Sequence, residues 1–327
     1  MGDLGRMSTI YGPVLSWRLG RSLGIDVVPP PKTCTFDCVY CQLGRTLRKV
    51  SGPVEGQVRR EELLRDMRRT LDLLDPRSID YVTFSGSGEP TLNLKLGDMI
   101  EDLRNLVDKP VAVLTNSSLV DNEVVRRSLA KADLVVAKLD APNQSLLEDI
   151  NRPAKGILHK NIVDGLVKVR GEVHGELALQ IMFIESNASH AVNANCEAVE
   201  GLIRLVQEIE PDEVQINTPT RPPSEKDVFP LKPNRMEEIT RRFRASVEHT
   251  RIVSRYEEKE KVSPKWLGYN KVEEEILGLI QRRPCRLGDI AMSLNLPRNV
   301  VETHLMELKK RGKVTVVKYG EEDYFKT

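Results

Sequence analysis

The sequence predicts an α/β fold in which about six strands form a partial (β/α)6 barrel, followed by a small C-terminal domain. Two observations predict the barrel: apolar, β-branched segments alternate with helical segments, and polar residues cluster where the apolar segments end. A change of pattern over residues 271–327 predicts the second domain.

Five apolar segments have the composition of strands that are buried on both faces, as in a parallel sheet. A first strand near LGIDVVP brings the number to about six, which is too few for a closed eight-stranded barrel but enough for a partial one. The five segments are IDYVTFS (79–85), VAVLTNS (111–117), ADLVVAKLD (132–140), ELALQIMFIE (176–185) and DEVQINTP (212–219). The helical stretches lie near 61–74, 98–107, 122–130, 159–170 and 196–209.

A proline-rich stretch, TPTRPPSEKDVFPLKP (218–233), follows the last of these strands. Proline continues neither a helix nor a central strand, so we expect an ordered excursion along the mouth or flank of the barrel. A helix is expected at about 234–248 and a charged linker near 256–265. We therefore assign residues 1–225 to the barrel and 226–270 to the excursion, helix and linker.

The C-terminal residues, 271–327, have the pattern of three helices and a hairpin. Val272, Ile276 and Ile280 recur every four residues, RLGDIAMSLNLP gives a short second helix, and a third helix ends at Gly312. The remaining residues predict a hairpin around Gly320. This order is typical of a winged helix-turn-helix domain, which contacts nucleic acid or protein.

The composition is typical of a globular protein, with 40% hydrophobic residues, 30% charged residues and a net charge of +1. No apolar run approaches the ~18 residues needed to span a bilayer, and the first residues lack the apolar core of a signal peptide. We therefore expect a cytoplasmic protein with no membrane partner. The odd number of cysteines, five, and the clustering of three of them argue against a disulfide framework.

Three cysteines, Cys34, Cys38 and Cys41, have the spacing C-x3-C-x2-C. Thiolates are soft ligands that favour zinc or iron–sulfur clusters. A structural zinc ion takes four protein ligands, yet the nearest histidine is more than a hundred residues away and Cys196 and Cys285 are isolated. A [4Fe–4S] cluster on three thiolates fits better and leaves one iron open to a substrate or cofactor. Zinc and chance clustering are the alternatives.

With Tyr40 before the last cysteine, this motif resembles the C-x3-C-x-aromatic-C signature of the radical S-adenosylmethionine (SAM) superfamily. The resemblance covers roughly residues 10–225. More narrowly, GPVLSWRLGRSLGID and KTCTFDCVYCQLGRT resemble the archaeal and bacterial group classed with wyosine-synthase-like radical SAM proteins. The resemblance implies a [4Fe–4S] cluster on Cys34, Cys38 and Cys41 whose open iron binds SAM. It also implies an external electron donor of the flavodoxin or ferredoxin type, whose electron leads to a 5′-deoxyadenosyl radical.

The segment SGSGEPTLN (85–93) follows a strand, where the superfamily has a Gly-Gly-Glu element. Ser87, Gly88 and Glu89 align with it, so that one glycine is replaced by serine. The resemblance implies that Glu89 accepts the SAM ammonium group. A glycine-rich turn between a strand and a helix is the simpler alternative.

Polar residues at the other strand ends are further candidates for the cofactor site. Asn116 and Ser117 could bind the ribose or methionine part of SAM or form a turn, and Lys138 and Asp140 could face the radical or form an ion pair. Gln180 is expected to face the interior. Asn217 is expected near the adenine or the substrate. Arg18 and Arg21 could grip a carboxylate or phosphate.

The remaining cysteines limit the chemistry. No cysteine precedes Cys34, and Cys196 and Cys285 lie far apart, which disfavours an auxiliary cluster and wyosine synthesis proper. We expect these two to be small buried hydrophobic residues.

The predicted function is SAM-dependent radical chemistry on a macromolecular substrate, for example on a base of a tRNA. For residues 271–327, eleven Lys/Arg against nine Asp/Glu leave nucleic acid (tRNA), a protein partner and dimerisation open. The alternatives are an iron–sulfur regulator that senses redox state or SAM and binds DNA through the winged helix, and a radical SAM enzyme acting on a protein, peptide or small molecule.

Overall fold

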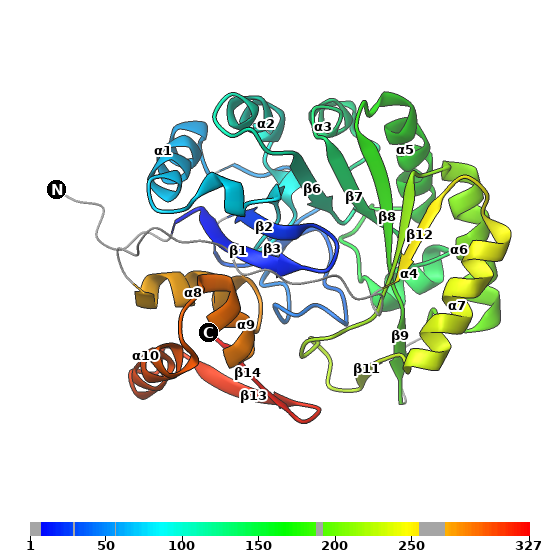
Figure 1. The fold of residues 1–327 in the computed structure, drawn as a ribbon. Coiled ribbons are helices and arrows are strands. Elements are labelled where there is room, and N and C mark those ends of the chain that lie inside the picture. The colour runs from blue at the N-terminus through cyan, green and yellow to red at the C-terminus, as the bar shows by residue number, and fades with distance from the viewer. Residues whose placement is uncertain (1–7, 29, 56, 188–191, 255–271) are drawn as a thin grey trace.

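The structure is a computed structural model that describes residues 8–28, 30–55, 57–187, 192–254 and 272–327. Its centre is a curled eight-stranded sheet in the order β1-β2-β5-β6-β7-β8-β10-β12 (Figure 1). The strands from β2 to β12 pair in parallel, whereas β1 pairs antiparallel with β2 at one edge. This half-barrel confirms the predicted fold class.

The predicted strands are present, with two additions and one division. The β1 hairpin strand and the final β12 strand were not predicted, and the segment 176–185 is divided into β8 and β9. The sheet strands are β1 Ile10–Ser16, β2 Gly20–Ile25, β5 Tyr81–Phe84, β6 Val111–Thr115, β7 Leu134–Lys138, β8 Glu176–Met182, β10 Glu213–Asn217 and β12 Arg251–Ser254. Two short strands, β3 Thr33–Cys34 and β4 Arg48–Lys49, form a separate ladder. They lie in the loop between β2 and α1 (Arg60–Leu71) that carries Cys34, Cys38 and Cys41, which we call the cysteine loop.

Helices cover the outer, convex face of the sheet (Figure 1). Their buried faces and the strands share one large apolar core, in which Phe84, Phe183 and Phe243 are fully buried. The helix α4 was not predicted. The helices that follow the strands are α1 Arg60–Leu71, α2 Leu96–Arg104, α3 Glu123–Leu129, α4 Gln144–Ile150, α5 His159–Glu172, α6 Cys196–Ile209 and α7 Pro233–Ser246.

The proline-rich stretch is ordered, as predicted. Its strand β11 (Val228–Pro230) pairs antiparallel with β9 (Ile184–Ser186) beyond the end of β8. Pro233 then occupies the first turn of α7, where its missing N–H costs nothing. The predicted charged linker, 256–265, lies outside the described residues.

The C-terminal residues form three helices and a hairpin in the predicted order. These elements are α8 Val272–Arg282, α9 Leu287–Leu294, α10 Arg298–Lys310, β13 Thr315–Tyr319 and β14 Glu322–Lys326. They pack as a unit against β1 (Figure 1), and Tyr11 of β1 is buried in the same apolar cluster as Ile276, Leu279 and Leu305. We call residues 272–327 the C-terminal segment.

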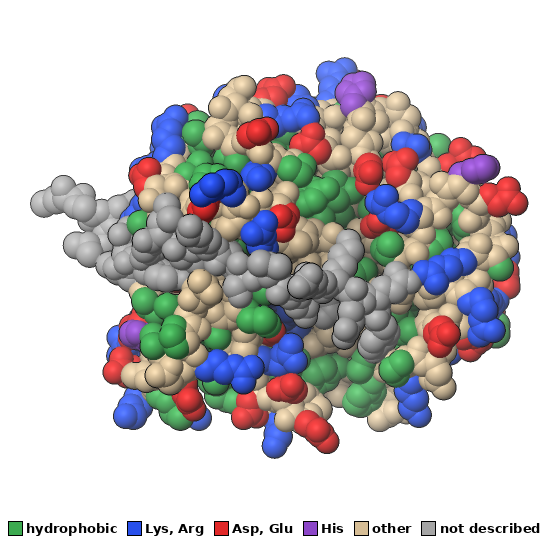
Figure 2. Space-filling view, viewed as in Figure 1, with side chains coloured by type: hydrophobic (Ala, Val, Ile, Leu, Met, Phe, Trp, Pro, Cys, Tyr) green, Lys and Arg blue, Asp and Glu red, His purple; other side chains and the backbone are tan. Residues whose placement is uncertain are grey.

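The surface carries both signs of charge. Figure 2 shows basic and acidic side chains interspersed over one face, as the net charge of +1 leads one to expect. None of the described helices is long and apolar enough to cross a membrane.

Candidate active site

A cavity of about 840 Å³ lies where the parallel strands end, between the half-barrel and the C-terminal segment. In parallel α/β folds this edge gathers side chains from several strands. All three cysteines of the motif line the cavity, together with strand-end residues and residues of α8 and α9. Of the residues predicted for the site, the cavity lining includes Cys34, Cys38, Tyr40, Cys41, Gly88, Glu89, Asn116, Lys138, Gln180 and Asn217.

The cysteine loop follows β2 and presents its three thiols to one space. Burial raises the pKa of Cys34 to about 12 and that of Cys38 to about 11. Sulfur atoms on one zinc ion at about 2.3 Å lie roughly 3.8 Å apart, but among the described residues these three sulfurs do not all lie within 4.8 Å of one another. The spacing suits a larger metal group.

Each of the three sulfurs receives a hydrogen bond from a different side chain. Asn116 Nδ2 donates to Cys34 Sγ at 3.4 Å, and Asn151 Nδ2 donates to Cys38 Sγ at 3.4 Å. Lys32 Nζ donates to Cys41 Sγ at 3.1 Å and to the Gly44 carbonyl at 2.5 Å. Donors at sulfur stabilise negative charge there and tune the potential of a bound cluster. The sequence predicted only Asn116 among these donors.

The Glu89 carboxylate is buried, with 2% of the residue exposed. It accepts hydrogen bonds from the Thr91 amide and hydroxyl, from Thr115 Oγ1 and from the Asn116 amide. Burial raises the pKa of Glu89, and these four donors oppose that rise. The result is one preorganised acceptor beside the thiols.

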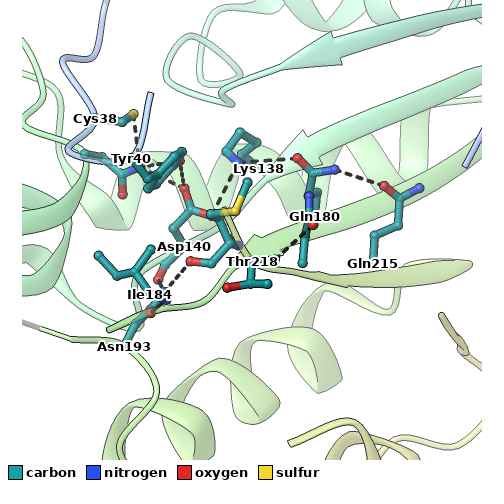
Figure 3. A network of polar contacts seen from close by, with 12 residues as sticks. Cys38, Tyr40, Lys138, Asp140, Gln180, Ile184, Asn193, Gln215 and Thr218 are labelled. Carbon is teal, nitrogen blue, oxygen red and sulfur yellow. Dashed lines mark hydrogen bonds and ion pairs between the residues drawn. The ribbon is translucent and has the colours of Figure 1, made fainter. Parts of the chain in front are cut away.

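Asp140 contacts the cysteine loop through a hydrogen bond from Tyr40 (Figure 3). Its carboxylate accepts hydrogen bonds from Tyr40 Oη, from Asn151 Nδ2 at 2.8 Å and from the Met182 amide at 2.8 Å. Lys138 Nζ lies 3.6 Å from Asp140 and 4.8 Å from the centre of the Tyr40 ring. Asp140 is not among the residues that line the cavity, so it contacts the loop rather than the space within.

Hydrogen bonds join the side chains of Lys138, Gln180 and Gln215 on three neighbouring strands (Figure 3), and of these Lys138 and Gln180 line the cavity. Gln180 accepts from Lys138 Nζ at 3.4 Å and donates to Gln215 at 3.2 Å, and Arg18 Nη1 also donates to Gln215 at 3.2 Å. Gln180 therefore faces the interior, as predicted. Met182, two residues further along β8, lines the cavity too.

Two other predicted residues turn away from the cavity. Ser87 donates its amide and hydroxyl to Asp26 Oδ2, at 3.0 and 2.6 Å. Ser117 is fully buried, and neither side chain belongs to the cavity lining. Gly88 does line it, and a Cβ there would meet the Thr33 carbonyl oxygen at 1.9 Å, so glycine is required for the cysteine loop to pack.

Two residues outside the cofactor set lie away from the cavity, and for one of them, Cys196, the expected burial was wrong. Arg21 forms a bidentate pair with Asp80 at the start of β2, away from the cavity, because the two strands begin side by side there. Cys196 is exposed at the start of α6, whereas Cys285 is buried as expected.

The sequence also missed the contribution of the C-terminal segment to the cavity. Arg282, Arg283, Arg286 and Asp289 line it. Their approach depends on docking against β1, which leaves no local pattern in the sequence. Lys32 had a weak signal, its position two residues before Cys34, and Asn151 had none.

Comparisons with known proteins agree with this geometry. The radical SAM superfamily profile matches residues 28–185. A radical SAM methyltransferase from Sphaerobacter thermophilus superposes with a TM-score of 0.52 at 17% identity, over 72% of this chain and 65% of that one. SuiB of Streptococcus suis superposes with a TM-score of 0.50 at 15% identity, over 70% of this chain and 49% of that one.

The fold and the three-cysteine site define a radical SAM enzyme. A UPF0026 protein of Methanocaldococcus jannaschii is 34% identical over 322 residues, 95% of this chain and 96% of that protein. A UPF0026 protein of Synechocystis is 40% identical over 213 residues, 65% of this chain and 76% of that protein. The chain belongs to the UPF0026 family.

A protein of Brachyspira hyodysenteriae named GTPase Obg is 34% identical over 305 residues. The match covers 93% of this chain but 43% of that protein, so this chain corresponds to less than half of its length. The present sequence contains no G-x4-G-K-[S/T] phosphate-binding motif. The GTPase name therefore describes that protein and says nothing about the activity of this chain.

Membership of the radical SAM superfamily gives this enzyme a [4Fe–4S] cluster and SAM as its cofactors. The residues present fit both groups. Three thiols share one cavity with a wider spacing than one zinc ion takes, and a buried carboxylate lies in the same lining.

Proposed function

We propose that this chain cleaves SAM reductively and directs the resulting 5′-deoxyadenosyl radical to a C–H bond of a substrate held between the half-barrel and the C-terminal segment. The observation that carries the proposal is the common cavity of Cys34, Cys38, Cys41 and Glu89 at the strand ends. A cluster held by the three cysteines would supply the electron for this cleavage, and an external donor of the flavodoxin or ferredoxin type would reduce the cluster.

The side chains divide into those that hold the cluster and those that hold SAM. Cys34, Cys38 and Cys41 ligate the cluster, and the donors on their sulfurs compensate the thiolate charge. Glu89 accepts the SAM ammonium group, since its carboxylate is fixed by four donors before SAM arrives. Preorganisation of this kind lowers the entropic cost of binding.

The remaining polar residues of the cavity orient the rest of SAM. Asn116 and Gly88 lie beside the cysteine loop, and Lys138 and Gln180 line the cavity from β7 and β8. Asn217 also lines the cavity, and its Oδ1 accepts a hydrogen bond from the Thr218 amide. Tyr40, Asp140, Ser87 and Ser117 support these residues from behind or beside them.

For the substrate, we propose a base of an RNA, with tRNA as the leading candidate. Helices α8–α10 and the hairpin β13–β14 follow the order of a winged helix, a domain that often binds nucleic acid. This domain would comprise residues 271–327, next to a barrel of residues 1–225 and a connecting part, 226–270. A tRNA substrate predicts that RNA co-purifies with the protein and is lost when the C-terminal segment is deleted.

The second candidate, a DNA-binding regulator that senses redox state or SAM, is less well supported. Residues of α8 and α9 line the cavity, so the C-terminal segment is part of the wall of the reaction chamber. A sensor domain that acts only on DNA has no need to enclose the cofactor site.

The deciding experiment is anaerobic incubation of the reconstituted protein with SAM and dithionite. We expect 5′-deoxyadenosine and methionine, and no product from Cys34→Ala, Cys38→Ala or Cys41→Ala. Cys196→Ala is the matched control, because Cys196 is exposed on α6 and should retain activity. Intact SAM after prolonged incubation of the wild-type protein would sink the proposal.

A further inference from the structure

The wall that the C-terminal segment adds to the cavity is rich in arginine. Six cationic side chains line the cavity against two carboxylates, and cations remain in excess when the carboxylates behind the wall, Asp26 and Asp140, are counted. The cationic residues are Arg18, Lys138, Arg221, Arg282, Arg283 and Arg286, and the two carboxylates are Glu89 and Asp289.

The cofactors do not use this excess. A [4Fe–4S]²⁺ cluster with three thiolates carries one negative charge, and SAM, with its sulfonium, carries one positive charge, so that together they are neutral. The excess positive charge of the lining is therefore available to the substrate.

Three of the arginines gather around a single carboxylate. Burial raises the pKa of Asp289, but a hydrogen bond from Arg286 and the nearby charges of Arg221 and Arg283 outweigh it and lower the pKa overall. Arg286 binds Asp289 at 3.0 Å and the exposed Glu322 at 3.3 Å. Even with both carboxylates counted, the guanidinium groups outnumber them.

The group of arginines around Asp289 joins the barrel to the C-terminal segment. Arg221, which follows β10, donates its Nε to the carbonyl of Pro284 at 3.0 Å, next to Arg283 in the chain. The Arg283 Nε is buried without a hydrogen-bond partner among the described residues. A buried donor with no partner is costly unless a ligand satisfies it.

We propose that Arg221, Arg283 and Arg286 bind a phosphate group of the substrate, and that the C-terminal segment thereby completes the substrate site. Several guanidinium groups in one place match a dianionic phosphate better than a single carboxylate, since each presents a planar fork of donors. The proposal rests on the proposed function, because it takes this cavity as the reaction chamber.

Cavity size limits the part of the substrate that enters. A volume of about 840 Å³ lies within the ~300–1,000 Å³ usual for small-molecule sites, and here it also accommodates the cluster and SAM. The unit bound inside is therefore no larger than a nucleotide. Both a free phosphorylated metabolite and one nucleotide of an RNA present this chemistry.

The test is calorimetric titration of the anaerobically reconstituted holoprotein, with SAM bound, using inorganic pyrophosphate as the probe. We expect Arg283→Gln to weaken pyrophosphate binding by about tenfold or more and Arg283→Lys to weaken it less. Arg68→Gln is the matched control, since it removes the same charge from the exposed face of α1 and should bind as wild type.

Two further ligands separate the sources of the phosphate. Tighter binding of uridine monophosphate than of a single-stranded oligouridylate would indicate a free metabolite, the reverse would indicate RNA, and either supports the site if Arg283→Gln weakens it. Unchanged pyrophosphate binding in Arg283→Gln, or an equal loss of acetate binding, would overturn it. SAM cleavage by the same preparations is measured separately, so that this inference can fail while the proposed function stands.

Discussion

At the scale of single residues, Glu89 is buried beside the cysteine loop, and its carboxylate accepts hydrogen bonds from four donors. Glu89→Gln removes the charge and points an amide N–H₂ at groups that are themselves donors. We expect SAM to bind at least tenfold more weakly and unfolding free energy to fall by about 1–3 kcal/mol. Equilibrium dialysis with SAM measures the first effect and anaerobic urea unfolding the second.

The control for Glu89→Gln is Glu61→Gln, an exposed carboxylate at the start of α1. It should leave both SAM affinity and the brown absorbance of the cluster unchanged. Wild-type SAM affinity in Glu89→Gln would exclude this carboxylate as the ammonium acceptor.

Lys32 is the cationic donor nearest to a motif sulfur, with Nζ 3.1 Å from Cys41 Sγ. A positive charge beside a cluster ligand favours the reduced cluster, which carries one more electron. Lys32→Met should therefore shift the cluster potential to more negative values by tens of millivolts, as followed by EPR during a redox titration. Lys49→Met, on an exposed part of the same loop, is the control. A potential that stays at the wild-type value in Lys32→Met would contradict this role.

The residues predicted from the sequence are those with a local signal. The cysteines and Glu89 belong to short motifs, and Gln180 and Lys138 lie at strand ends that the apolar pattern locates. Asn151 reaches Cys38 across 113 positions, and no local pattern specifies such a contact. The same limit explains why Asp140 was predicted in the cavity, although its partners hold it behind the cysteine loop.

At the scale of elements, α8 has a titrating position on its half-buried face. Burial raises the pKa of Glu275 to about 7, and the charge of Glu274 adds to the rise, while Arg69 and Arg282 oppose it. Because the folded-state pKa lies above the unfolded value of about 4.5, the folded protein holds this proton when the unfolded chain has lost it. Unfolding free energy therefore falls as pH rises from about 4.5 to about 7, by on the order of 2 kcal/mol.

Glu275→Gln removes this loss. We expect the variant to unfold at higher denaturant concentration than the wild type at pH 8 and at a similar concentration at pH 4.5, measured by anaerobic urea unfolding. Glu302→Gln, exposed on α10, should show no such difference between the two pH values. Equal stability of Glu275→Gln and the wild type at pH 8 would count against the assignment.

Which elements were predicted follows from their length and composition. The central strands are continuous apolar runs, and the long helices have apolar residues at helical spacing. β1 contains Gly12 and Pro13 and its register shifts between Tyr11 and Val14, so it lacks an alternating pattern. β12 has four residues and α4 has seven, which are too few for a periodicity to emerge.

At the scale of the whole molecule, the C-terminal segment is tied to the cofactor site by one buried ion pair. Arg282 Nε lies 3.1 Å from Asp26 Oδ2, and the two side chains are 5% and 4% exposed. Asp26 also accepts both hydrogen bonds from Ser87, in the loop that leads to Glu89. Arg282 further donates to the Ser8 carbonyl and lies 4.8 Å from the centre of the Tyr11 ring.

This connection spans 256 positions of the sequence, and it explains why the docking of the C-terminal segment could not be predicted. The three helices and the hairpin each have a local pattern, so their existence was foreseen. Their placement over the cavity depends on the complementarity of α8 and α9 to β1, which only the folded molecule reveals.

Breaking the pair tests whether it couples the two parts of the molecule. Arg282→Met leaves the Asp26 carboxylate buried without its cation, and removal of one partner of a buried pair costs about 3–5 kcal/mol. We expect lower unfolding free energy, faster tryptic cleavage ahead of α8 and weaker SAM binding, because Asp26 also positions Ser87. In the double variant Arg282→Met, Asp26→Asn the loss should be smaller than the sum of the single losses. Additive losses, or an Arg282→Met protein with wild-type stability and SAM affinity, would mean that the C-terminal segment is held by its apolar contacts with β1 alone and that the ion pair does not link it to the cofactor site.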